Sequence, residues 1–290
     1  MEPFVNAMIQ GILIGGLYSM FATGLALIFG IMRLVNIAHG DLIVLAAYIA
    51  LIVTQSLGLN PLLALLVVIP IMALVGYGLQ RGLFNRTMGT DVMPSLLVSF
   101  GLSVIIQNGL LILFSADNRR LQAGAIEVAS LTLTDTISIG LLPLLQLVLA
   151  VLVIVGLQFL LYRTAIGRAF RAVSDDPRIA QLMGLNNRHV FGLAMALSCA
   201  IVALAGVLLA IRANFDPATG PTRLIFGFEA VIIGGLTSFW GTLAGGIILG
   251  IVQSLASYFD PGWQILAGHI AFLVVLAVRP NGLFGGTARS

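Results

Sequence analysis

Polar residues set within or beside long apolar stretches are the positions of this chain where chemistry is best sought. They form two groups, each next to a hydrophobic stretch and each with a glycine: Asn36, His39, Gly40 and Asp41 in the first, and Glu229, Thr237, Ser238 and Gly241 in the second. Because burial of a polar group in lipid is costly, such side chains commonly line or gate the path of a polar solute. The alternative is structural, since Asn36 and Asp41 suit a helix cap and Glu229 would stabilise a helix N-terminus.

Several kinds of chemistry are excluded by the residue types present. All 14 basic residues are arginine, so a phosphate-binding P-loop and a Schiff base, which both need a lysine, are excluded on this chain. The three histidines and the single cysteine, Cys199, lack the spacing of metal ligands, and we predict no metal site. The arginines flank apolar stretches and do not form one basic face, so we expect no nucleic-acid partner.

The segment 174–184 carries the signals of one short helix with both ends specified. Asp176 suits the N-cap, Pro177 the first helical position, and Gly184 the residue just past the end. The expected helix of seven residues places four apolar side chains on one face, namely Ile179, Ala180, Leu182 and Met183. So short a helix is marginal by itself in water. Its apolar face therefore either folds back on a membrane surface or docks into a groove of a partner protein.

The composition indicates that the polar groups are surrounded by lipid. Of 290 residues, 59% are hydrophobic and 9% are charged, whereas soluble domains have about 25% charged residues. Uncharged stretches reach the length of about 20 residues that a spanning helix needs. We predict an all-α, polytopic integral membrane protein, with one transmembrane domain over 1–290. Its eight hydrophobic segments are 7–32, 41–57, 61–80, 93–114, 141–162, 190–211, 229–257 and 263–278.

Arginines predict how these segments are oriented. Short loops rich in arginine stay in the cytoplasm, and the loop 163–189 holds five of them. We therefore place this loop and the C-terminus in the cytoplasm, and the loop 115–140 outside. The pair Arg119 and Arg120 in that outer loop opposes the rule.

The segment 229–257 cannot be one simple crossing if the C-terminus is cytoplasmic. It contains a glycine-rich interruption at 234–241, which we interpret as a half-helix entering from outside, a turn within the membrane and a longer helix returning outward. Broken helices of this kind mark transport sites in other carriers. The alternative is an ordinary glycine-rich packing helix. Pairs of glycines four apart, such as Gly11 with Gly15 and Gly246 with Gly250, also favour close helix packing.

Four segments closely resemble the permease family of ABC transporters for branched-chain amino acids. They follow one another along nearly the whole chain: Val35–Asp41, 167–186, 234–250 and Arg279–Gly285. The form of the first is similar to the first of the two permease types of the family. In that segment the family usually has Phe before Ala-His-Gly and often Glu after it, whereas this chain has Ile37 and Asp41.

The resemblance implies a subunit of an importer in the bacterial cytoplasmic (inner) membrane. The implied partners are a second permease subunit, two ATP-binding subunits, an extracytoplasmic solute-binding protein and the lipid bilayer. No cofactor is expected on this chain, since ATP and Mg would be bound by the ATPase subunits, and the chain itself is no enzyme. The loop 163–189 would hold the ATPase-coupling helix. Its expected site residues are Gly167, Arg168, Arg171, Asp175, Asp176, Pro177, Ile179, Ala180, Leu182, Met183 and Gly184.

Two other functions compete with this interpretation. A secondary transporter driven by an ion gradient shares broken helices, but it would not need a partner-docking loop. An enzyme acting within the membrane would need a nucleophile with a base, or paired carboxyl groups, inside spans; the sequence has no Gly-x-Ser-x-Gly elbow and no such pair. The solute is a branched-chain amino acid by resemblance, with urea and short amides as related alternatives.

Overall fold

A computed structural model describes residues 2–87, 92–134 and 137–284 of the chain, and these residues are almost entirely helical. Their elements are α1 (Glu2–Met32), α2 (His39–Leu57), α3 (Pro61–Leu79), a π-helical turn (Gln80–Phe84), α4 (Asn85–Thr87), α5 (Met93–Phe114), α6 (Ala125–Val128), β1 (Ser130–Thr134), β2 (Ile137–Gly140), α7 (Leu141–Arg163), α8 (Ala165–Asp175), α9 (Pro177–Leu182), α10 (Asn187–Arg212), α11 (Gly220–Gly234), α12 (Phe239–Phe259), a 3₁₀ turn (Pro261–Trp263) and α13 (Gln264–Val278). Within the described residues, eight helical segments are long and apolar enough to cross a membrane. The prediction of an all-α polytopic membrane protein is confirmed.

Contacts divide the chain into two compact units, which do not follow the order of the sequence. The first comprises 1–26, 122–154 and 225–290, and the second comprises 27–121 and 155–224. Helices α1, α7 and α11 each run from one unit into the other.

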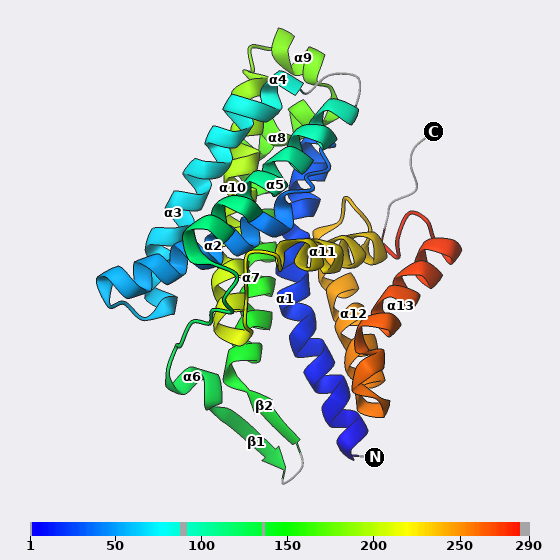
Figure 1. Ribbon diagram of the computed structural model, residues 1–290. Helices are drawn as coiled ribbons and strands as arrows, with labels where there is room; N and C mark the ends of the chain where they lie inside the picture. Colours follow the sequence, from blue (N-terminus) through cyan, green and yellow to red (C-terminus); the bar gives the residue numbers. More distant parts are fainter. Residues whose placement is uncertain (1, 88–91, 135–136, 285–290) are drawn as a thin grey trace. The chain divides into compact units, whose positions relative to one another are not determined.

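In the first unit, glycines let α1 and α12 approach at backbone distance. A methyl group added at Gly11 or Gly15 would lie 2.5 Å from the Cα of Ile251 or Ile247, respectively. The close helix packing expected from the glycine spacing is therefore present, with Gly250 on the opposing helix. Helix α13 lies along α12 (Figure 1), and its Gly268 packs against the side chain of Gln253.

In the second unit, α10 packs against both α2 and α3 (Figure 1). Gly206 of α10 lies against the backbone of Ile43, and Gly76 of α3 lies against Cys199, which is buried as a free thiol. Small residues at these crossings permit close packing where no hydrophobic effect drives helices together.

The predicted interruption of the seventh segment is present. Helix α11 ends at Gly234, Gly235 has a φ of 105°, and α12 begins after Ser238, whose hydroxyl accepts a hydrogen bond from the Gly241 amide at 3.0 Å. The half-helix begins at Gly220, nine residues before the predicted start. Its length of about 22 Å is still shorter than the hydrocarbon core of about 30 Å.

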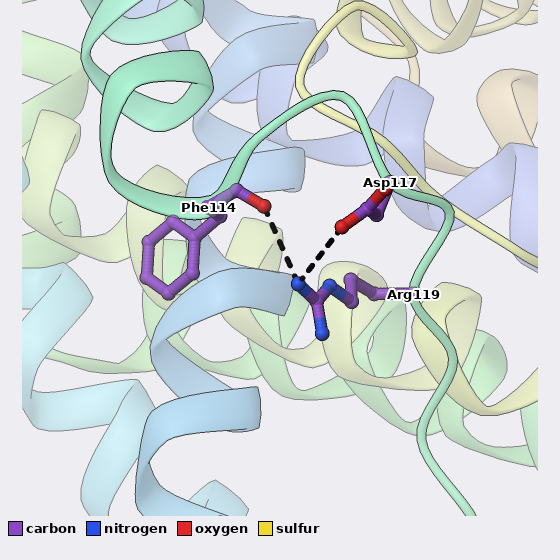
Figure 2. Close-up of polar contacts among 3 residues, drawn as sticks. All are labelled: Phe114, Asp117 and Arg119. Atoms are coloured by element: carbon purple, nitrogen blue, oxygen red, sulfur yellow. Dashed lines mark hydrogen bonds and ion pairs between the residues drawn. The ribbon is translucent and has the colours of Figure 1, made fainter.

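The loop 115–140 contains an antiparallel hairpin of β1 and β2 that the sequence did not predict. Its two arginines lie at helix C-termini. Arg119 donates to the carbonyl of Phe114 and pairs with Asp117 at 3.4 Å (Figure 2), and Arg120 donates to the carbonyl of Ile211 at 3.1 Å. A helix C-terminus favours a cation, and both arginines are held there by these local partners.

Candidate functional site

The loop between α7 and α10 is built from short helices that begin at side-chain caps. Thr164 accepts from the amide of Gly167 at 3.1 Å and starts α8. Asp176 accepts from the amides of Arg178 at 2.7 Å and Ile179 at 3.1 Å, and starts α9. Asn186 likewise caps α10. The predicted helix is confirmed, with six residues, Pro177–Leu182, in place of seven.

The C-terminal end of α9 also lies where the sequence predicts it. Gly184 has a φ of 87°, and its amide bonds to the carbonyl of Gln181 at 3.0 Å, while the Leu185 amide bonds to the carbonyl of Ala180 at 3.1 Å. The loop thus leaves α9 through a left-handed residue, where glycine avoids the steric cost of a side chain.

The apolar side chains of α9 do not share one face, contrary to the prediction. Ala180 is 3% exposed and packs inward, whereas Leu182 is 86% exposed and both Ile179 and Met183 are also exposed. The buried side chain of Ala180 packs α9 against the rest of the loop. The other three side chains project outward. Beside them lies a polar recess of about 600 Å³, whose lining includes Gln181 and Asn187.

Helix α8 packs closely against the end of α7. Gly167 lies so close to the carbonyls of Leu160 and Leu161 that a side chain would collide with them. Arg171 donates to the carbonyl of Leu161 and lies over the ring of Tyr162 at 5.1 Å, so it caps the end of α7. Two further predicted site residues, Arg168 and Asp175, are exposed.

Asn36, His39 and Asp41 form a buried cluster at the start of α2, each at most 1% exposed. The amide of Gln107 on α5 donates to the carboxyl group of Asp41 at 3.0 Å and to the hydroxyl of Ser103 at 3.1 Å.

Neither Asn36 nor Asp41 occupies the N-cap position of α2. The N-cap of α2 is Ala38, which makes no side-chain cap. The Asn36 side chain accepts from the Ala38 amide at 3.1 Å, within a turn that precedes the helix. Because the cluster is closed over on all sides, it does not line an open passage in this conformation.

Two helix starts meet at this cluster. A side chain at Gly40 would overlap the carbonyl oxygen of Gly220, the first residue of α11, and a side chain at Gly220 would overlap the carboxyl oxygen of Asp41. Only glycine fits at either position. The acidic side chain of Asp41 therefore lies in the first turn of α2 and beside the first residue of α11, where helix N-termini favour it.

The second predicted group is dispersed. Glu229 lies in the middle of α11, so its expected place at a helix N-terminus is wrong. It is buried and bonds to Nδ1 of His269 on α13. Ser238 and Gly241 form the start of α12, as described above, and Thr237 is exposed in the turn.

The C-terminal segment completes the end of α11. The amides of Leu283 and Phe284 donate to the carbonyls of Ile233 at 2.9 Å and Gly234 at 3.1 Å. These carbonyls have no partner within a helix that stops there. Gly285, the last residue of the Arg279–Gly285 motif, lies outside the described residues.

Three partners in these sites were not identified from the sequence as members of them. These are Ser103, Gly220 and Ser174, of which Gly220 and Ser174 lie far along the chain from the residues they contact. Ser174 of α8 donates to the carbonyl of Gly30 at 2.6 Å and so joins the loop to the last turn of α1. The stripe Ser99, Ser103 and Gln107, at intervals of four on α5, was the available signal for a polar helix face.

Comparison with known proteins finds similarity along nearly the whole chain. The family model described as "Branched-chain amino acid transport system / permease component" matches residues 7–278. BraD, the high-affinity branched-chain amino acid transport system permease protein of Pseudomonas aeruginosa, is 26% identical over 97% of this chain and 96% of its own length. LivH of Escherichia coli is 26% identical with the same coverage, and the probable LivH of Methanocaldococcus jannaschii is 28% identical over 94% of this chain and 90% of its own length.

No solved structure matches the chain. The family model nevertheless covers nearly all of the sequence, and the matched region includes seven of the eight spans in full, most of the first, and both groups of polar residues described above. The chain therefore belongs to the family of permease components of branched-chain amino acid transport systems.

Proposed function

We propose that this chain is the permease subunit of an ATP-driven importer that carries branched-chain amino acids across the bacterial cytoplasmic membrane. The observation that carries the proposal is helix α9, which is fixed at both ends yet projects Ile179, Leu182 and Met183 outward. A rigid helix with unpartnered apolar side chains suits docking into a groove of another protein. The chain lacks lysine and hence a P-loop, so the ATPase is a separate subunit.

The proposed assembly contains this chain, a second permease subunit, two ATP-binding subunits that hold ATP and Mg, and an extracytoplasmic solute-binding protein. The loop 163–189 and the C-terminus face the cytoplasm. The bond from Ser174 to Gly30 then puts the end of α1 on the cytoplasmic side. Because α1 is 31 residues long and crosses the membrane once, the N-terminus is extracytoplasmic.

A continuous series of contacts can carry motion from α9 to the buried cluster. Asp176 ends α8 and caps α9, and Ser174, two residues earlier, bonds to α1 at Gly30. The segment 33–38 follows directly and leads into the cluster at the start of α2. We propose that the cluster is a gate, closed in this conformation, and that ATP-driven movement of α9 shifts it. A rigid element between two states is a usual device for such coupling.

The proposal is tested by replacing one exposed apolar residue of α9. Leu182→Glu should weaken binding of the ATPase subunits by about tenfold or more, as loss of an interface anchor does, and stop ATP-dependent leucine uptake into proteoliposomes. The matched control is Val128→Glu in the outer hairpin loop, since Val128 is 85% exposed and Leu182 is 86% exposed. The control should retain the ATPase subunits through purification.

Equal retention of the ATPase subunits by wild type and Leu182→Glu would contradict the docking role of α9. Uptake of urea or of short amides, without leucine, isoleucine or valine, would contradict the proposed solute class.

A further inference from the structure

His269 is a polar residue in an unusual position. It is the only ionisable side chain between Pro261 and Val278, and it lies at the midpoint of that span. This span is also the least buried of the eight, with 6% of its membrane-length window covered. An imidazole at the midpoint of an exposed span lies where hydrocarbon offers no hydrogen bond.

The orientation of the ring follows from its neighbours in the first unit. Gly268 packs inward against Gln253 of α12, and Nδ1 of His269 bonds to Glu229 of α11. The Glu229 side chain is 4% exposed, whereas that of His269 is 39% exposed. Because Nδ1 faces Glu229, the opposite edge with Nε2 lies on the exposed side of α13. Among residues 2–87, 92–134 and 137–284, no hydrogen bond to Nε2 is formed.

The surface around this edge is apolar. Ile265, Leu266 and Leu273, one turn before and after His269, are all exposed. A water-filled passage would be lined by further polar groups, and bare lipid would leave Nε2 without a partner at a considerable cost. A single polar group in an apolar helix face is typical of helix–helix contacts in membranes, where such groups bond across the contact.

We propose that this face of α13 packs against the second permease subunit, and that Nε2 of His269 forms a hydrogen bond with a polar group of that subunit. The inference rests on the proposed function, which supplies the second subunit. Glu229 is then a positioning residue, because its bond to Nδ1 turns Nε2 outward. This role would explain why a carboxyl group is buried in the middle of α11.

Site-specific photocrosslinking in membranes that contain the complete transporter tests the contact. A benzophenone side chain at Leu273, beside His269, should form an adduct with a permease-sized chain, whether that chain is a second copy or a different permease. The matched control is Leu74 of α3, an exposed leucine on an apolar helix of the other unit. Adducts with lipid alone at Leu273, or permease adducts at Leu74 without any at Leu273, would overturn the inference.

The hydrogen bond is tested in the Leu273-labelled chain. His269→Phe should lower the yield of the adduct by about threefold, the effect of one interhelical hydrogen bond in a membrane, whereas Glu229→Gln, which can still bond to Nδ1, should leave most of it. An unchanged yield in His269→Phe, at equal amounts of inserted protein, would overturn the role of Nε2.

The same samples are purified in detergent and probed for the ATPase subunits. If ATPase and permease subunits co-purify while the crosslink lies elsewhere, the inference fails and the proposed function stands. If neither co-purifies with this chain, the proposed function itself fails.

Discussion

The loop 163–189 and the buried cluster at the start of α2 are both short polar motifs, yet they are stabilised in opposite ways. In the loop, each helix is started by its own side chain, as Asp176 starts α9, and the apolar residue Leu182 is left outside. In the cluster, no side chain caps α2. Asp41 instead accepts a hydrogen bond from Gln107 of α5 and lies against the first residue of α11, Gly220.

This difference indicates which of the two sites tolerates substitution of its residues. A local cap contributes about 1 kcal/mol and can be lost without moving another element. Two backbones in contact through Gly40 and Gly220 cannot accept even a methyl group without separating. The loop is thus suited to be a lever, which must move as a unit, and the cluster is suited to be a gate, which must close fully.

The largest effect is expected where the two helix starts meet. Gly40→Ala places a methyl group against the Gly220 carbonyl, and overpacking of this kind costs about 1–3 kcal/mol even where side chains can adjust. Here backbone lies on both sides, so we expect uptake to fall by more than about tenfold, since about 1.4 kcal/mol corresponds to a factor of ten. Uptake into proteoliposomes at equal protein amounts measures it.

The control for this substitution is Gly101→Ala on α5, because a methyl group there meets nothing within 4 Å. It should leave uptake unchanged. Equal uptake by the Gly40→Ala and Gly101→Ala variants would show that the helix starts do not need to approach, and the closed gate would have to be abandoned.

A smaller effect is expected from the hydrogen bonds of the cluster. Gln107→Leu removes the donor to Asp41, and a buried polar group left without its partner costs about 1–3 kcal/mol. We expect a lower melting temperature of the detergent-solubilised protein and slower uptake. The adjacent control, Asn108→Leu, should change little, because Asn108 donates only to the carbonyl of Val104 in its own helix.

A double substitution decides whether the effect comes from this pair. Asp41→Leu together with Gln107→Leu should cost less than the sum of the two single changes, because residues that share one bond are not additive. Strict additivity would mean that Asp41 and Gln107 act through other partners.

The same contrast explains what could be predicted from the sequence. The predicted ends of α9 are confirmed because Asp176, Pro177 and Gly184 affect only the backbone next to them in the sequence. The inward face of Ala180 was missed because a helix of six residues has no clear apolar stripe, and only the packing of the loop decides which side is covered.

The buried contacts were beyond prediction for a different reason. The pairing of Asp41 with Gln107 joins residues 66 positions apart, and that of Glu229 with His269 joins residues 40 positions apart. No local rule specifies such pairs. A polar residue within a span indicates that it has a polar partner. Which residue that partner is depends on how the helices cross, and the sequence does not specify the crossing.

The smallest effect in this comparison is expected from the cap of α9. Asp176→Ala removes the acceptor for the amides of Arg178 and Ile179, which should weaken α9 by about 1 kcal/mol. The helix is still held by the inward packing of Ala180 and by the bond from Asn187 to the Pro177 carbonyl. We therefore expect ATP-dependent uptake to fall only about twofold to fivefold, the range that up to 1 kcal/mol allows.

Asp175→Ala is the matched control, because Asp175 is a neighbouring exposed acid that caps no helix. Equal uptake by the two variants would mean that α9 is ordered by the partner it docks on and not by its own cap, and the contrast between a preformed lever and a packed gate would weaken accordingly.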